Sequence, residues 1–212
     1  MSGDWRQEPL LPGVKQRVFL VRHGETDKVA KGRCYGKLDV PLSELGIQQM
    51  AQSAQLLAPL GPTRIISSPR VRALDSANTI ATACALKVSV NEQFAELHFG
   101  DFEGLRYEEV EAKYPEFYSN WMTHPTEVTF PNGESYNSMS ERVVSGFEHL
   151  ITSGLGEKTV LVAHGGVIRI ILAQILALDP KYVFRLDQSY SAISCLDFYG
   201  DTPLLRVMNW LP

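Results

Sequence analysis

Two apolar segments that each end in a His-Gly pair constrain the fold of this chain most strongly. Residues 18–21 run directly into Arg22-His23-Gly24, and residues 159–163 run into His164-Gly165-Gly166. Short apolar runs rich in β-branched residues are typical of buried strands. In open α/β sheets the carboxyl ends of parallel strands border one crevice, and ligands bind there. We therefore expect both histidines to lie in one site at that edge of a sheet.

Strand and helix patterns alternate over much of the chain. Strands are predicted over residues 17–21, 64–67 and 159–163, and a C-terminal hairpin over 192–198 and 204–208. This alternation predicts an α/β fold, a three-layer αβα sandwich with a mostly parallel central sheet. One domain is expected over residues 17–212, with residues 1–16 as a loose N-terminal tail.

Helices are expected between these strands. Ser43 is a predicted N-cap for a helix with an apolar face at Ile47, Met50, Ala51, Ala54, Leu57 and Ala58. Ser68-Pro69 is predicted to cap and begin a helix that runs to about Leu86. Two further helices are expected, one capped by Ser135 and one over residues 167–178.

Residues 104–134 interrupt the alternation. They contain three prolines and six aromatic residues, which predicts one or two short helices followed by a loop. A segment of this kind is either a lid over a site or a small satellite core, and the sequence leaves both open.

Composition excludes several classes of function. The chain has 212 residues, 44% hydrophobic and 21% charged, with a net charge of −4, which is typical of a soluble globular protein without a nucleic-acid footprint. No apolar run approaches a membrane span. Cys34, Cys84 and Cys195 are far apart, so neither a disulfide framework nor a zinc site is indicated, and a reducing cytoplasm is the expected location. A homodimer through the C-terminal hairpin is an open alternative.

The strand ends carry residues suited to phosphate chemistry. Arg72 falls in a predicted first helical turn, where its charge opposes the helix dipole unless an anion binds there. With Arg22 it could offset phosphoryl charge while one imidazole attacks phosphorus. A carboxyl is then needed as general acid. Glu96 is the candidate, and spacing alone leaves three equal competitors, Glu25, Asp101 and Glu103.

Five motifs follow one another in order along the chain. They are RHGET at 22–26, SSPRVRALDSA at 67–77, ELHFGDFEG at 96–104, NGES at 132–135 and VLVAHGG at 160–166. Together they resemble the histidine phosphatase superfamily, in its phosphoglycerate mutase-like branch. The resemblance implies a phosphatase without metal or cofactor that acts on a small-molecule phosphate ester. It also implies the residue roles: His23 as nucleophile, Glu96 as acid, His164 as second pocket histidine, Arg22 and Arg72 as phosphate ligands, and Thr26, Tyr35, Gly36 and Gly165 as substrate contacts.

Two further segments bear on the substrate. Val29 occupies the position where many relatives carry an Asn that touches the phosphate. Residues 32–42, GRCYGKLDVPL, are most similar to α-ribazole phosphatases, which act in cobalamin biosynthesis. The resemblance thus favours a phosphatase for α-ribazole 5′-phosphate. A phosphoglycerate mutase, a broad-specificity small-molecule phosphatase and a non-catalytic interaction module are the alternatives.

Overall fold

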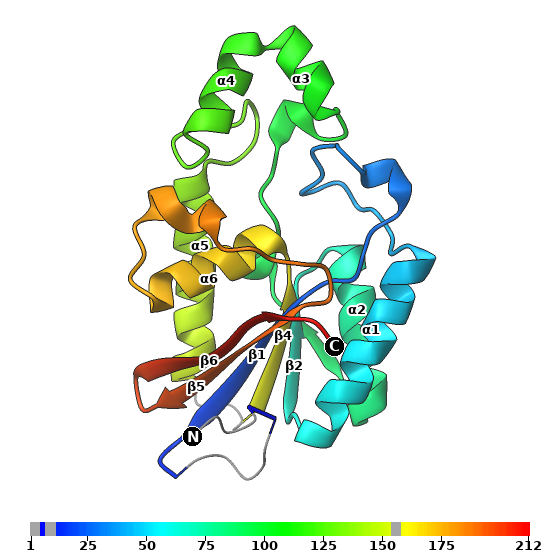
Figure 1. Ribbon diagram of the computed structural model, residues 1–212, viewed down its shortest axis with the longest axis vertical. Coiled ribbons are helices and arrows are strands. Elements are labelled where there is room, and N and C mark those ends of the chain that lie inside the picture. The colour runs from blue at the N-terminus through cyan, green and yellow to red at the C-terminus, as the bar shows by residue number, and fades with distance from the viewer. Residues whose placement is uncertain (1–4, 7–11, 154–157) are drawn as a thin grey trace.

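A six-stranded mixed sheet forms the centre of the protein (Figure 1). The computed structural model describes residues 5–6, 12–153 and 158–212. The strand order is β3-β2-β4-β1-β5-β6. The first four of these strands are mutually parallel, and β5 and β6 add an antiparallel hairpin. The strands are β1 (Gln16–Arg22), β2 (Arg64–Ser67), β3 (Val88–Val90), β4 (Lys158–Ala163), β5 (Ile193–Tyr199) and β6 (Thr202–Trp210).

Helices cover both faces of the sheet, which confirms the three-layer α/β prediction (Figure 1). One face packs against α1 (Glu44–Leu57) and α2 (Val71–Cys84), the other against α5 (Tyr136–Thr152) and α6 (Gly165–Ile175). Strand β1 is buried on both sides: alternate residues enter the two cores, which explains its continuous apolar run.

Two helix predictions were wrong in detail. Ile47 is 57% exposed, and Ala51 is also exposed. The reason is Gly46, where a Cβ would lie 2.0 Å from the Glu25 carbonyl oxygen, so the helix presents its smallest residue to that backbone and turns Ile47 outward. Helix α2 begins at Val71 with Arg70 as N-cap, after the predicted Ser68-Pro69 start.

Residues 104–134 form α3 (Tyr107–Lys113), α4 (Pro115–Thr123) and a loop, at the top of Figure 1. Val110, Trp121, Val128 and Phe130 of this segment pack with Cys34 and Phe102 in a separate small core. Within the described part of the chain, none of the helices has the length and apolar character to span a bilayer.

The remaining described elements are short 3-10 helices: η1 (Lys28–Ala30), η2 (Ala58–Leu60), η3 (Glu92–Phe94), η4 (Gly100–Phe102) and η5 (Pro180–Arg185). Of the expected N-terminal tail, residues 1–4 and 7–11 lie outside the described residues. Trp5, which is described, packs edge-on against Trp210 of β6 with ring centroids 5.4 Å apart.

Candidate active site

A cavity of about 640 Å³ opens where β1, β2 and β4 end. Its lining includes His23 at the end of β1, Arg72 near the start of the helix after β2, and Gly166 just after β4. The parallel strands thus deliver the motif residues to one place, as their positions predicted. Aromatic side chains from distant segments also line it: Tyr35, Phe99, Tyr107, Trp121, Phe184 and Tyr190.

His23 is held in one tautomer. Its Nδ1 lies 2.8 Å from the Gly24 carbonyl oxygen, which can only accept, so the proton is on Nδ1 and the lone pair is on Nε2. Burial lowers the pKa of His23 well below 6.5, and the charges of Arg72 and Arg22 lower it further. The imidazole is therefore neutral near pH 7, with a free lone pair.

His164 stands beside it. The two rings meet edge to face with centroids 5.1 Å apart. His164 Nε2 lies 2.7 Å from the Ser68 hydroxyl oxygen, while Nδ1 is buried without a hydrogen-bond partner among the described residues. Burial, then Arg72 and His23, lower the pKa of His164 well below 6.5. If the Ser68 hydroxyl donates to Nε2, the proton stays on Nδ1 as a donor.

Both arginines are anchored by backbone carbonyls. Arg22 Nη1 donates to the Gln188 carbonyl, and its guanidinium carbon lies 4.0 Å from the centroid of the Tyr190 ring. Arg72 is fully buried and donates to the Leu38 carbonyl at 3.1 Å and the Gly36 carbonyl at 2.9 Å. In each, Nε is buried and has no hydrogen-bond partner in the described part of the chain. Such donors suit the oxygens of an anion.

Glu103 anchors the loop that holds Arg72. Its carboxylate accepts from the backbone N–H groups of Gly36 (3.1 Å), Lys37 (2.8 Å), Leu38 (3.0 Å) and Phe99 (3.0 Å). Gly36 is required there, because a Cβ would lie 1.5 Å from the Leu97 carbonyl oxygen. Gly36 thus supplies a carbonyl to Arg72 from behind the cavity lining. Because both oxygens of Glu103 hold this loop, Glu103 has a structural role and is not a candidate for the general acid.

Glu96 lies at the cavity beside the start of α6. Its Oε2 accepts from the Gly166 N–H at 3.1 Å and its Oε1 from the Leu97 N–H at 2.8 Å. Of the competitors, Asp101 accepts from the side chain of Asn132 and does not line the cavity. Glu25 does line it, with one oxygen accepting from Ser43. Of the four candidates, Glu96 and Glu25 line the cavity, and Glu96 is the one that the ELHFGDFEG motif marks.

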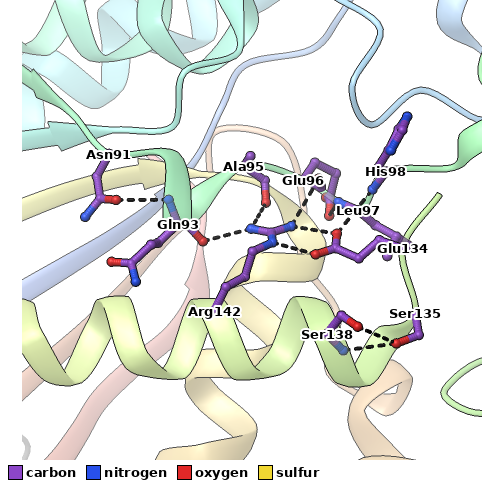
Figure 2. A network of polar contacts seen from close by, with 10 residues as sticks. All are labelled: Asn91, Gln93, Ala95, Glu96, Leu97, His98, Glu134, Ser135, Ser138 and Arg142. Atoms are coloured by element: carbon purple, nitrogen blue, oxygen red, sulfur yellow. Dashed lines mark hydrogen bonds and ion pairs between the residues drawn. The ribbon is translucent and has the colours of Figure 1, made fainter. Parts of the chain in front are cut away.

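An arginine fork fixes the Glu96 segment from behind (Figure 2). Arg142 of α5 pairs with Glu134 at 2.7 and 2.9 Å. The same guanidinium donates to the carbonyls of Gln93 and Ala95, both at 2.8 Å, and Glu96 at 3.3 Å. The NGES motif supplies Glu134, so this motif positions the acid segment from outside the main cavity.

The other expected contacts divide into two groups. Thr26 and Tyr35 line the cavity. Gly165 lies under two guanidinium groups, where a Cβ would come within 3.0 Å of Arg169 Nη1 and 3.6 Å of Arg22 Nε. Val29 is 62% exposed and outside the lining. Cys34 is buried in the small core, where burial raises its pKa to about 12, which argues against a nucleophilic thiolate.

Sequence reasoning missed Ser68, Arg169 and Tyr190. Arg169 lies one helical turn after Gly165, so its place on α6 was open to prediction. Tyr190 lies in the loop before β5, outside every motif, and no sequence signal marked it. Among the described residues no group of three or more His, Cys, Asp or Glu side chains could hold a metal ion.

Known proteins are similar to this chain in sequence. The family model of the histidine phosphatase superfamily (branch 1) matches residues 18–211. A bifunctional protein of Mycobacterium tuberculosis is 33% identical over 93% of this chain, which spans only 54% of that relative. The metal-independent phosphoserine phosphatase of Arabidopsis thaliana is 32% identical over 98% of this chain and 84% of its own length.

Solved structures agree with this. The α-ribazole phosphatase from Shigella flexneri superposes with a TM-score of 0.85 at 26% identity, covering 92% of this chain and 96% of its own. Mycobacterial glucosyl-3-phosphoglycerate phosphatase gives 0.81 at 29% identity, covering 92% and 98%. The chain, in which the rings of the two strand-end histidines lie side by side, belongs to the histidine phosphatase superfamily, branch 1.

Proposed function

We propose that this protein is a metal-independent phosphomonoesterase that works through a phosphohistidine on His23. One observation carries the proposal: Arg22 Nε, Arg72 Nε and His164 Nδ1 are buried without a hydrogen-bond partner in the described residues, on side chains grouped around the His23 ring. The two arginine nitrogens are donors, and His164 Nδ1 is a donor when the Ser68 hydroxyl donates to Nε2. Unpaired buried donors are costly, and a phosphoryl group would satisfy all three. The named phosphatase activities of the relatives support the same reaction class.

In the first step, the lone pair on His23 Nε2 attacks phosphorus and the bond to the ester oxygen breaks. Protonated Glu96 donates its proton to that oxygen, and the alcohol leaves. The Nδ1 proton stays on the ring and remains bonded to the Gly24 carbonyl, which favours the positive charge that forms. Arg22, Arg72 and His164 offset the charge on the phosphoryl oxygens.

In the second step, water attacks phosphorus and gives a proton to the Glu96 carboxylate. The electrons of the N–P bond return to Nε2, so inorganic phosphate leaves and the site is restored. The first step needs His23 neutral, and the lowered pKa of its buried ring meets that need at neutral pH.

For the substrate we propose α-ribazole 5′-phosphate, placing the protein in cobalamin biosynthesis in the cytoplasm. A cavity of about 640 Å³ is in the range of sites for whole small molecules and much larger than a phosphate group. Phe99, Tyr107 and Trp121 line it, and aromatic side chains in a cavity wall suit a planar base. The loop 32–42 supports the same choice.

The proposal is tested with purified protein and p-nitrophenyl phosphate. His23→Ala should abolish turnover, EDTA should leave the wild type unchanged, and alkaline quenching, under which a phosphohistidine is stable, should trap label from a ³²P ester on wild type only. The exposed His124→Asn variant is the matched control and should keep full activity. Full turnover by His23→Ala would refute the mechanism.

A panel then separates the substrates. It compares α-ribazole 5′-phosphate with phosphoserine, glucosyl-3-phosphoglycerate and sugar phosphates, and assays mutase turnover of 3-phosphoglycerate with and without a bisphosphoglycerate primer. The highest kcat/KM should fall on α-ribazole 5′-phosphate. Even rates across the panel would indicate a broad-specificity phosphatase, and primer-dependent isomerisation would indicate a mutase.

A further inference from the structure

Three hydroxyl groups form a row along one wall of the cavity. Thr26 Oγ1 donates to the Tyr35 hydroxyl at 3.2 Å, and the Tyr35 hydroxyl lies 2.9 Å from that of Tyr190. All three residues line the cavity. They come from segments far apart in the sequence, so only the fold creates this row.

Counting protons shows what the row can offer a ligand. Three hydroxyls carry three protons, and the two links use two of them. Thr26 donates to Tyr35, and either hydroxyl can be the donor in the link between Tyr35 and Tyr190. In the arrangement where Tyr35 donates, all bonds of the row run in one direction. The unused proton is then the one on Tyr190.

Tyr190 lies against the reacting groups. Its ring centroid is 5.6 Å from that of His23, and the Arg22 guanidinium stacks on its face at 4.0 Å. Among residues 5–6, 12–153 and 158–212, its hydroxyl has Tyr35 as its one hydrogen-bond partner. An O–H whose oxygen accepts a bond from a neighbour is polarised and becomes a better donor.

We propose that the Tyr190 hydroxyl is a further binding residue, which donates a hydrogen bond to an oxygen of the phosphoryl group. The inference rests on the proposed function, because it takes the anion beside His23 to be a phosphate ester. The ring of Tyr190 has a second role, because the Arg22 guanidinium stacks on its face. Thr26 and Tyr35 act through Tyr190 by orienting its proton.

Tyr190→Phe tests the proposal, because it removes the hydroxyl and keeps the ring under Arg22. We expect the Kd for inorganic phosphate, measured by calorimetry, to rise about tenfold, because this is the effect of losing one hydrogen bond to a charged group. The kcat/KM for p-nitrophenyl phosphate should fall by a similar factor. Tyr182→Phe on η5, outside the cavity lining, is the matched control and should change neither value.

Two more variants test the direction of the row. Tyr35→Phe and Thr26→Val leave the Tyr190 proton in place, so each should weaken phosphate binding less than Tyr190→Phe does. A neutral Tyr190→Phe, or a Thr26→Val loss larger than that of Tyr190→Phe, overturns the inference. A wild type that neither binds phosphate nor turns over any ester instead contradicts the proposed function itself.

Discussion

The imidazole rings of His23 and His164 meet edge to face at 5.1 Å, although one follows β1 and the other β4. The two strands are direct neighbours in parallel register, with Arg22 opposite Ala163. Each ring therefore leaves its strand at the same height. Within the described part of the chain neither ring has a carboxylate as a hydrogen-bond partner, and burial, followed by the charge of Arg72, lowers the pKa of both. The pairing of β1 with β4 thus places the two imidazoles side by side, and their lowered pKa values keep both neutral.

The first prediction concerns stability and pH. Both histidines have pKa values well below 6.5 in the folded protein, so below pH 6.5 the unfolded chain binds protons that the folded protein does not. The contribution of the two histidines to the free energy of unfolding should therefore be complete above pH 6.5 and should decrease as the pH falls below 6.5. Urea unfolding at pH 7.5, 6.5 and 5.5 in phosphate-free buffer measures this. His164→Asn should reduce the slope, whereas exposed His124→Asn should not; equal slopes would contradict the argument.

The second prediction concerns the acid. Glu96→Gln cannot protonate a leaving oxygen, so kcat/KM for an alkyl phosphate, which reports the phosphorylation step alone, should fall by roughly 10² to 10⁴. With p-nitrophenyl phosphate the loss should be much smaller, because nitrophenolate leaves without a proton. Steady-state kinetics with both esters gives the ratio. Glu25→Gln is the comparison, since Glu25 also lines the cavity. A larger leaving-group dependence in Glu25→Gln would move the role to that residue.

The third prediction concerns the arginine fork behind Glu96. Lysine at position 142 keeps the charge but cannot bind Glu134 and three carbonyls at once (Figure 2). Arg142→Lys should lower kcat about tenfold or more, because the Glu96 carboxyl would no longer be held in its position. The Kd for inorganic phosphate should stay within about twofold of the wild-type value. Arg185→Lys, exposed on η5, serves as control and should leave kcat unchanged. A weaker phosphate affinity with unchanged kcat would show that the fork does not act on Glu96.

The fourth prediction concerns Glu103. Glu103→Gln places an NH₂ group among four backbone N–H donors, so the bonds to Gly36, Lys37 and Leu38 cannot all remain. We expect a loss of about 1–3 kcal/mol in the free energy of unfolding. Phosphate affinity should also fall, because this loop supplies the carbonyls that hold Arg72. Urea unfolding and calorimetry measure the two effects. The exposed Glu111→Gln is the control, and unchanged phosphate affinity in Glu103→Gln would separate the loop from the site.

Much of the fold could be predicted from local pattern. Buried strands such as β1 and β4 are predicted by their apolar runs. Ser43 and Ser135 cap α1 and α5, as their positions indicated. The errors came from contacts between distant segments. Gly46 approaches the backbone at Glu25 and rotates α1, and Ser68 is drawn to His164 instead of capping a helix. The periodicity of a single helix cannot predict either contact, because both join segments that are distant in the sequence.

The sequence by itself determined the family and predicted the site: its motifs placed His23, Arg22, Arg72, Glu96 and His164 at strand ends or in the glycine-bounded loop, and parallel strands bring such ends together. Only the tertiary structure decided how each group is held. It assigned Glu103 to an anchor, Arg142 to the acid segment and Tyr190 to the wall beside His23. The physical reason is that hydrogen-bond partners are set by distance in space, and those partners lie tens of residues apart in the chain.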